Sequence, residues 1–329
     1  MTLDRDARVV VTGAGGFIGG WLAAELLASG YRRVRAVDYK PFDEWYQCHA
    51  EAENLRLDLR DSAACAQALR SSQLVYHLAS DMGGMGFIEV NKADCMLSVL
   101  IDGHLLQAAR DAGCQRFFYA STACVYPAHL QDTIEPRPLR EDDVYPAMPE
   151  DGYGWQKLYG ERLCRHFRED FGLETRVGRY HNVYGEYGTW QGGREKAPAA
   201  ICRKVAEAVR SGRHEIEIWG DGSQTRSFTY IADCIHGTRA LLESEVAEPL
   251  NVGSDRLVSI DELVSLVESF AGVTLERRYR LDAPRGVAGR NSDNDRIKSA
   301  LGWAPSIPIE VGLERTYRWI EGELHRAGG

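Results

Sequence analysis

The segment "RVVVTGAGGFIGG" (residues 8–20) decides the fold of this chain. A β-branched apolar run leads into Gly13, Gly16 and Gly19, and these open the helical pattern of residues 17–30. This G-x-x-G-x-x-G spacing allows a tight turn, lets the backbone approach a pyrophosphate and directs helix N-terminal N–H groups at the anion. By itself a glycine triplet also fits a tight turn without a ligand, so the evidence for a bound dinucleotide has to come from the rest of the chain.

The elements that follow predict a parallel sheet covered on both faces. Apolar runs predict further strands, and helical patterns lie between them; the strands are expected at 33–39, 74–80, 116–122 and 174–180, and the helices at 99–113 and 153–172. Such alternation is typical of the α/β, doubly wound (Rossmann) class. After residue 180 shorter elements and a helix near 197–211 predict a smaller lobe. The Pro- and acid-rich stretch 135–152 predicts a long surface loop.

Composition limits the classes of function. The formal net charge of −9 argues against a nucleic-acid surface, and no apolar stretch approaches the roughly 18 residues of a membrane span. The N-terminus enters a strand without a signal-peptide pattern. The eight cysteines form no C-x-x-C pair, so we expect neither a zinc site nor disulfides, and a cytoplasmic location.

Two carboxylates support a dinucleotide at the glycine turn. Asp38 ends the second predicted strand, where an acid binds the ribose hydroxyls and repels a 2′-phosphate, so NAD is favoured over NADP; Lys40 nearby weakens that preference. Asp58 follows a third strand, where it can accept from the adenine amino group or be an ordinary loop residue. We expect further cofactor contacts from Phe17, Ile18 and Leu59.

A candidate acid/base group follows in the sequence. Tyr153 and Lys157 are spaced i and i+4 on one helix face. An ammonium near a phenol stabilises phenolate, and Lys157 can also hold the nicotinamide ribose. Thr122, at a strand end, would donate to the substrate oxygen that Tyr153 protonates or deprotonates. The spacing alone is common on partly exposed helices.

Together these motifs resemble the extended short-chain dehydrogenase/reductase family of nucleotide-sugar enzymes, over nearly the whole chain. Within it the chain is most similar to the GDP-mannose 3,5-epimerase group. The stretches that carry this likeness are "DMGGMGF" (81–87), "STACVYP" (121–127), "GGREKAPAA" (192–200), "WGDGSQTRSF" (219–228) and "GVAGRNSDN" (286–294).

The resemblance implies a reaction cycle. NAD oxidises the sugar at C4, the ketone acidifies the hydrogens at C3 and C5, two protein groups exchange those protons, and the hydride returns. That pair would be Cys124 and Lys196. If the strand continues through Cys124, its side chain points to the same side as that of Thr122. Without the resemblance, Cys124 fits a buried packing residue equally well, and an exposed lysine in a glycine-rich loop is the preferred interpretation of Lys196. Position 123 is Ala, which lacks the acid that a dehydratase needs.

The resemblance also suggests a substrate site and an assembly. Arg226 and Arg290 would bind the diphosphate in a bidentate manner. Further substrate contacts are expected from Gly86, Asn182, Lys196, Lys204 and Gln224. Residues 1–178 with about 226–252 would form the NAD-binding domain, and residues 179–225 and 253–329 the nucleotide-sugar lobe. A homodimer would form through the helices that begin near residues 99 and 153. Two positions depart from the family pattern: Ser98 stands where many members have Asn, and Ser227 where many have Asp.

Three readings remain open at this point. The first is an NAD-dependent epimerase of a GDP-sugar. The second is another nucleotide-sugar epimerase, acting at C4 or at C5 only on a modified GDP-sugar. The third is a non-catalytic NAD-binding protein of the same fold, against which the presence of Tyr153 and Lys157 argues.

Overall fold

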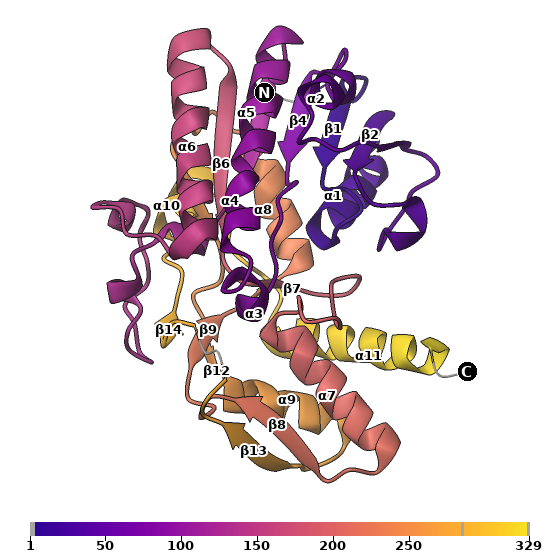
Figure 1. Ribbon diagram of the computed structural model, residues 1–329, viewed down its shortest axis with the longest axis vertical. Coiled ribbons are helices and arrows are strands. Elements are labelled where there is room, and N and C mark those ends of the chain that lie inside the picture. The colour runs from indigo at the N-terminus through magenta and orange to yellow at the C-terminus, as the bar shows by residue number, and fades with distance from the viewer. Residues whose placement is uncertain (1–3, 284–285, 328–329) are drawn as a thin grey trace.

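The structure is a computed structural model that describes residues 4–283 and 286–327. Within these residues, the largest element is a seven-stranded parallel sheet (Figure 1). Its strands, in spatial order, are β11 (Leu250–Val252), β6 (Glu174–Tyr180), β5 (Arg116–Thr122), β4 (Leu74–His77), β1 (Arg8–Thr12), β2 (Arg33–Asp38) and β3 (Glu53–Arg56). The predicted doubly wound fold is confirmed. Because the order reverses beside β1, the carboxyl ends of β1 and β4 flank a crevice in which ligands of such folds bind.

Helices cover both faces of the sheet (Figure 1). One face carries α2 (Ser62–Ala68), α5 (Val99–Asp111) and α6 (Asp151–Phe171); the other carries α1 (Phe17–Ala28) and α8 (Ile231–Glu243). The strands alternate accordingly: Val9 and Val11 belong to the core under α1, and Val10 to the core under α5. Both sheet faces are therefore buried, as the near-continuous apolar strands require.

A smaller lobe lies beyond the carboxyl ends of the strands (Figure 1). Its helices are α7 (Ala197–Ser211), α9 (Ile260–Ala271) and α11 (Ile309–Ala327), whereas α10 (Asp295–Leu301) packs against β11 at the edge of the main sheet. Its strand pairs and small sheet are β8 (Glu215–Trp219) with β13 (Glu276–Arg280), β7 (Val183–Tyr184) with β10 (Thr229–Tyr230), and β12 (Leu257–Ser259), β9 (Thr225–Ser227) and β14 (Gly289–Arg290). The chain returns to the main sheet through α8 and β11. The division into two domains stays a prediction, and residues 1–3, 284–285 and 328–329 of its ranges lie outside the described part.

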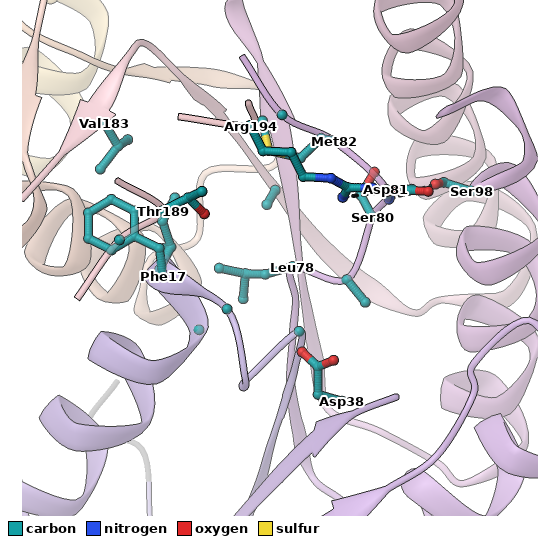
Figure 2. Close-up of a pocket in the computed structure, with 18 of the residues that line it drawn as sticks. Phe17, Asp38, Leu78, Ser80, Asp81, Met82, Ser98, Val183, Thr189 and Arg194 are labelled. Carbon is teal, nitrogen blue, oxygen red and sulfur yellow. Dashed lines mark hydrogen bonds and ion pairs between the residues drawn. The ribbon is translucent and has the colours of Figure 1, made fainter. Parts of the chain in front are cut away.

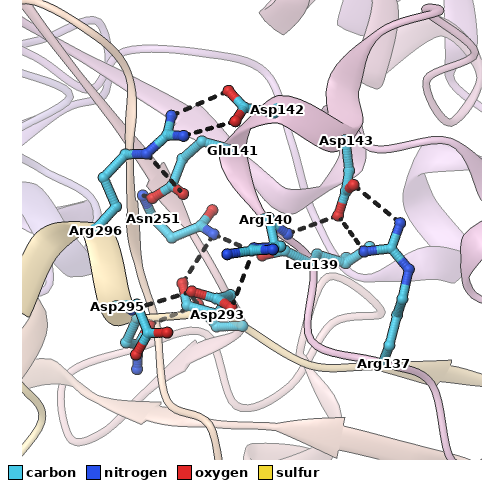
Figure 3. Close-up of polar contacts among 12 residues, drawn as sticks. Arg137, Leu139, Arg140, Glu141, Asp142, Asp143, Asn251, Asp293, Asp295 and Arg296 are labelled. Carbon is cyan, nitrogen blue, oxygen red and sulfur yellow. Dashed lines mark hydrogen bonds and ion pairs between the residues drawn. The ribbon is translucent and has the colours of Figure 1, made fainter.

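The stretch 135–152 is less of a surface loop than predicted. Leu139, Glu141 and Val144 are buried, and residues 141–144 form a short 3-10 helix. Figure 3 shows the reason: Asn251 of β11 donates to the carbonyl oxygens of Leu139 (2.8 Å) and Asp293 (3.1 Å), and its N–H donates to Glu141 (2.9 Å). These contacts tie the stretch to the end of the main sheet and to the segment after β14.

Two short helices follow β4, namely α3 (Met85–Ile88) and α4 (Lys92–Leu97). Helix α4 packs against α6, and its Asp94 and Leu97 line the crevice. None of the helices in residues 4–283 and 286–327 is long and apolar enough to cross a membrane.

Candidate active site

The glycine turn has the geometry that a dinucleotide requires. Gly13 has a φ of 71°, in the left-handed region that favours glycine, and Gly16 precedes the first turn of α1. A Cβ at Gly19 would collide with the carbonyl oxygen of Gly13, so helix and strand approach too closely for any side chain. The turn therefore leaves free N–H groups of α1 at the edge of the crevice.

The crevice is a cavity of about 820 Å³ between the carboxyl ends of the strands and the segment 183–199. It gathers all the predicted cofactor residues and four of the five predicted catalytic residues. These are Gly13, Gly16, Phe17, Ile18, Gly19, Asp38, Asp58, Leu59, Thr122, Tyr153, Lys157 and Lys196. Figure 2 shows Asp38 near the turn at one end and Arg194 reaching Asp81 at the other. Residues from remote parts of the sequence thus meet in one elongated site.

The carboxylates at the adenosine end are held in place. Asp38 accepts from the N–H groups of Gly15 (3.1 Å) and Lys40 (3.2 Å) and is almost fully buried. Asp58 is paired with Arg60 (2.6 Å), whose hydrogen bonds lower the pKa of that carboxyl. Both carboxylates can accept from hydroxyl or amino groups of an adenosine. The glycine cradle, these acceptors and the cavity size therefore fit a dinucleotide.

Thr122 and Tyr153 are hydrogen-bonded at the centre of the cavity. The Nζ of Lys157 lies 5.9 Å from the Tyr153 ring centroid and 4.9 Å from that of Tyr119. Burial raises the pKa of Tyr153 well above its usual value, with the Thr122 hydrogen bond opposing, and burial lowers the pKa of Lys157. The expected phenolate is thus not favoured by the protein alone, because desolvation outweighs the nearby ammonium.

A buried polar network that the sequence reasoning missed lies beneath Lys157. The carboxylate of Asp102 accepts from the Tyr119 hydroxyl (2.9 Å), from Gln156 Nε2 (2.6 Å) and from His77 Nε2 (2.9 Å). Its charge raises the pKa of Lys157 and so opposes burial. Nothing in the local sequence distinguishes Asp102 from an ordinary helical aspartate such as Asp111, at the end of the same helix. Ser98, which stands where many family members have Asn, also has a structural role. Its hydroxyl accepts a hydrogen bond from the N–H of Asp81 (3.0 Å) and so supports the cavity wall.

The expected geometry of Cys124 is wrong. Strand β5 ends at Thr122, and residues 123–125 form a 3-10 turn instead of continuing the strand. The turn forms because the N–H of Cys124 donates to the Thr122 hydroxyl oxygen (3.3 Å). The Cys124 side chain packs against Ile88, Cys95 and Tyr153, and it lines a second cavity of about 460 Å³ on the far side of Tyr153.

Lys196 precedes α7 and reaches into the first cavity. Burial lowers the pKa of Lys196, and Cys124 lies close enough to favour its charged form. The two predicted acid/base residues, Cys124 and Lys196, therefore lie near each other although they line different cavities.

The remaining predicted substrate residues do not belong to the described lining of the first cavity. Lys204 Nζ donates to the carbonyl oxygen of Glu217 (2.8 Å), and Gly86 faces the Trp219 ring. Asn182 donates to the carbonyl oxygen of Ser227 (3.2 Å). The Oε1 of Gln224 is buried without a hydrogen-bond partner in the part of the chain that the structure describes, which suits a ligand contact.

Arg226 and Arg290 are direct partners in the β9–β14 register. Burial lowers the pKa of Arg226 to about 10. Its guanidinium donates to the carbonyl oxygens of Thr225 (2.7 Å) and Val287 (2.6 Å). The two arginines therefore lie on neighbouring strands, side by side in the register.

Comparison with known proteins places this site in a family. The model of the NAD dependent epimerase/dehydratase family matches residues 9–253, which include the glycine turn, Thr122, Tyr153 and Lys157. The chain belongs to this family. NAD is accordingly its cofactor, as Asp38 and the glycine cradle indicate.

Curated members of the family extend the likeness over the whole chain. GDP-mannose 3,5-epimerase 1 of Oryza sativa subsp. indica is 45% identical over 98% of this chain and 84% of its own length. GDP-mannose 3,5-epimerase of Arabidopsis thaliana is 44% identical with the same coverage. Among solved structures, UDP-glucuronic acid 4-epimerase from Bacillus cereus, in complex with UDP-glucuronic acid and NAD, has a TM-score of 0.81 at 26% identity and covers 96% of this chain and 99% of that chain.

Proposed function

We propose that the protein is an NAD-dependent epimerase of a GDP-linked hexose resembling GDP-mannose. The observation that carries the proposal is the packing of Cys124 against Tyr153, with Lys196 lining the same cavity as Thr122 and Tyr153. A simple 4-epimerase needs only the hydride site, whereas a cysteine and a lysine beside it suit proton exchange at carbon. The 45% identity to the rice GDP-mannose 3,5-epimerase supports the same substrate class.

The residues divide the reaction between them. NAD, when bound, supplies a reversible hydride acceptor for C4 and a positively charged ring that favours a phenolate. Tyr153 then takes the proton of the C4 hydroxyl, and Thr122 donates a hydrogen bond to the same oxygen. Lys157 would hold the cofactor ribose, and the nearby Asp102 carboxylate favours the charged ammonium against the effect of burial.

Proton exchange at C5 and C3 falls to Cys124 and Lys196. With a ketone at C4, each neighbouring C–H bond breaks heterolytically, its electron pair enters an enolate, and the proton passes to the base. One group removes a proton and the other returns one to the opposite face. Burial lowers the pKa of Lys196, so the amine is available as a base as well as an acid.

We assign the nucleotide and diphosphate to the region around Arg226. Arg226 is the cation for the phosphates, and Asn182, Gln224, Lys204 and Gly86 supply contacts around it. The buried Oε1 of Gln224, which has no hydrogen-bond partner among the described residues, and the cation of Arg226 two positions later support this assignment.

We also propose a homodimer and a cytoplasmic location. α4, α5 and α6 present large exposed apolar side chains, a pattern suited to a partner surface. These are Met96, Leu97, Leu100, Trp155 and Tyr159. All eight cysteines are free thiols, a state that a reducing compartment preserves.

The test is incubation with GDP-mannose in D₂O, followed by NMR of the recovered sugar. We expect deuterium at C5 and C3, and none in Cys124→Ala or Lys196→Met. Deuterium at C5 only would support a single-centre epimerase. If no nucleotide sugar from a GDP- and UDP-linked panel takes up deuterium, although the protein holds NAD, the proposal fails.

A further inference from the structure

Arg290 occupies an unusual position for an arginine. Its side chain is only 5% exposed, and Nη1 of its guanidinium donates to the sulfur of Cys124 at 3.7 Å. The backbone of β14 brings it there through pairing with β9. A Cβ at the preceding Gly289 would collide with the carbonyl oxygen of Thr133, so the strand is pressed against the segment that follows Cys124.

Gln131 fixes the orientation of this guanidinium. Gln131 is completely buried, and its Nε2 donates to the carbonyl oxygens of Tyr126 (3.3 Å) and Pro127 (3.2 Å). The amide orientation is thereby set, and Oε1 accepts from Nε of Arg290 at 2.5 Å. The main chain of Gln131 also accepts from the N–H of Ala288 (2.9 Å). One side chain therefore locks Arg290 to the turn that carries Cys124.

Glu150 holds the other end of the guanidinium. Its carboxylate pairs with Nη2 of Arg290 in a largely buried contact. Its N–H donates to the carbonyl oxygen of Cys124 (2.8 Å), and its own carbonyl accepts from Gly154 in the first turn of α6 (2.8 Å). Glu150 thus connects Arg290, Cys124 and the helix that carries Tyr153.

We infer that Arg290, held by Gln131 and Glu150, is a positioning residue that stabilises the thiolate of Cys124. This inference rests on the proposed function, in which that thiolate is the base for a carbon acid. A thiolate in an apolar cluster loses hydration, and a guanidinium N–H directed at the sulfur replaces part of it. Three fixed contacts also keep the cation from turning away toward solvent or toward a phosphate.

Other charges act on the same sulfur, and their effects have to be separated. Charged and titratable groups face Cys124 from β14, β9, the residue before α7, α6, α4 and the walls of the second cavity. They are Arg290, Arg226, Lys196, Tyr153, Cys95, Glu150, Glu89, Asp132 and Asp151. Among them, Arg290 is the cation with a hydrogen bond to the sulfur. Its removal is therefore the change that tests the inference most directly.

The experiment measures the rate of iodoacetamide alkylation of Cys124 against pH, by peptide mass spectrometry of the holoenzyme without nucleotide sugar. The second cavity gives the reagent access to the thiol. We expect Arg290→Met to raise the pH of half-maximal reactivity by about 1–2 units and to slow alkylation at pH 7 about tenfold or more. Arg290→Lys keeps the positive charge but lacks the planar guanidinium, and Gln131→Met removes the hydrogen bond that orients the guanidinium. Both variants should raise the pH of half-maximal reactivity by less than Arg290→Met does.

Two controls accompany these variants. Cys48 is an exposed cysteine in the same digest, and its alkylation should be identical in all variants. Arg296→Met removes an arginine paired with Asp142, outside the network, and should leave the Cys124 profile unchanged. A thermal melt identifies variants that do not fold. A Cys124 profile identical to that of the original protein in every folded variant would overturn the inference. Because no sugar is present, this outcome is independent of the deuterium test of the proposed function.

Discussion

The guanidinium of Arg194 lies 3.0 Å from the carboxylate of Asp81, and this ion pair joins the segments that face each other across the cofactor cavity (Figure 2). The N–H of Gly84 donates to the carbonyl oxygen of Arg194 (3.0 Å), and the guanidinium stacks 3.7 Å from the Phe87 ring centroid. At the other end of the cavity the Tyr46 hydroxyl donates to Thr189 (2.9 Å). The segment before α7 is thus fastened over the site at two places.

Arg194→Met should weaken the retention of NAD. Both partners are about half exposed, so the ion pair is worth no more than about 1 kcal/mol, and NAD release should become about two- to fivefold faster. Release is followed by rapid gel filtration and enzymatic assay of the remaining nucleotide. Arg137→Met removes an equally exposed arginine paired with Asp143, remote from the cavity, and serves as the matched control. Equal release rates in the two variants would contradict a closing role for Arg194.

Tyr153→Phe should abolish turnover with little effect on the fold. The variant keeps the ring that packs beside Cys124 and loses the proton-transfer group, so kcat should fall about 10²–10⁴-fold. Bound NAD and the melting temperature should change little, because only the hydrogen bond to Thr122 is lost. NMR of sugar turnover with quantification of bound nucleotide checks both. Retained activity would assign the proton transfer to another group.

Asp38→Ser should change the cofactor preference. The carboxylate sits between the N–H groups of Gly15 and Lys40, and its charge disfavours a 2′-phosphate. We expect the Kd for NADH to rise about tenfold, consistent with the loss of a charged hydrogen bond, and the discrimination against NADPH to shrink. Nucleotide fluorescence titration of stripped protein measures both constants. An unchanged ratio of the Kd for NADH to the Kd for NADPH would show that Asp38 does not discriminate between the two riboses.

Much of this fold could be predicted because the deciding signals are local. Strand β6 was predicted with the bounds that it has, and α6 ends at Phe171 because Gly172 adopts a left-handed cap, φ 69°. The glycine turn, Asp38 and the Tyr153–Lys157 spacing are likewise short-range patterns. They identify the cofactor cavity without knowledge of the tertiary structure.

The contacts around Cys124 have no such local signal. Gln131 and Arg290 are 159 positions apart, and their hydrogen bond exists only because β14 pairs with β9. The burial of Glu141 depends in the same way on Asn251 of β11. A composition of proline and acidic residues predicts exposure on average, and a tertiary contact reverses it at particular positions. The turn at Cys124 is set by one hydrogen bond, from the N–H of Cys124 to the hydroxyl oxygen of Thr122, which strand propensity does not include.

His181 should make the protein less stable in acid. Burial lowers the pKa of His181 to about 4, and its Nε2 lies 3.1 Å from the Asn251 amide oxygen. A histidine with a depressed folded pKa contributes stability above its unfolded value near 6.5 and loses it as the pH falls toward the folded value. We expect a loss of about 2 kcal/mol in the free energy of unfolding by pH 5. His181→Gln keeps a hydrogen-bond donor at this position but does not titrate. In urea titrations, its free energy of unfolding should therefore depend less on pH between about pH 6.5 and pH 5. A parallel pH dependence in both proteins would contradict the assignment.

Leu100→Glu should dissociate the proposed homodimer. Leu100 on α5 is 46% exposed, and Trp155 and Tyr159, one turn apart on α6, are similarly exposed, so a charge at this position would be buried without a partner in an interface. Light scattering after gel filtration should give the mass of one chain, 36.7 kDa, for the variant and twice that for the original protein. Val209→Glu places the same charge at an equally exposed apolar position on α7 and should remain dimeric. If Leu100→Glu keeps the mass of the original protein, the contact does not involve this surface.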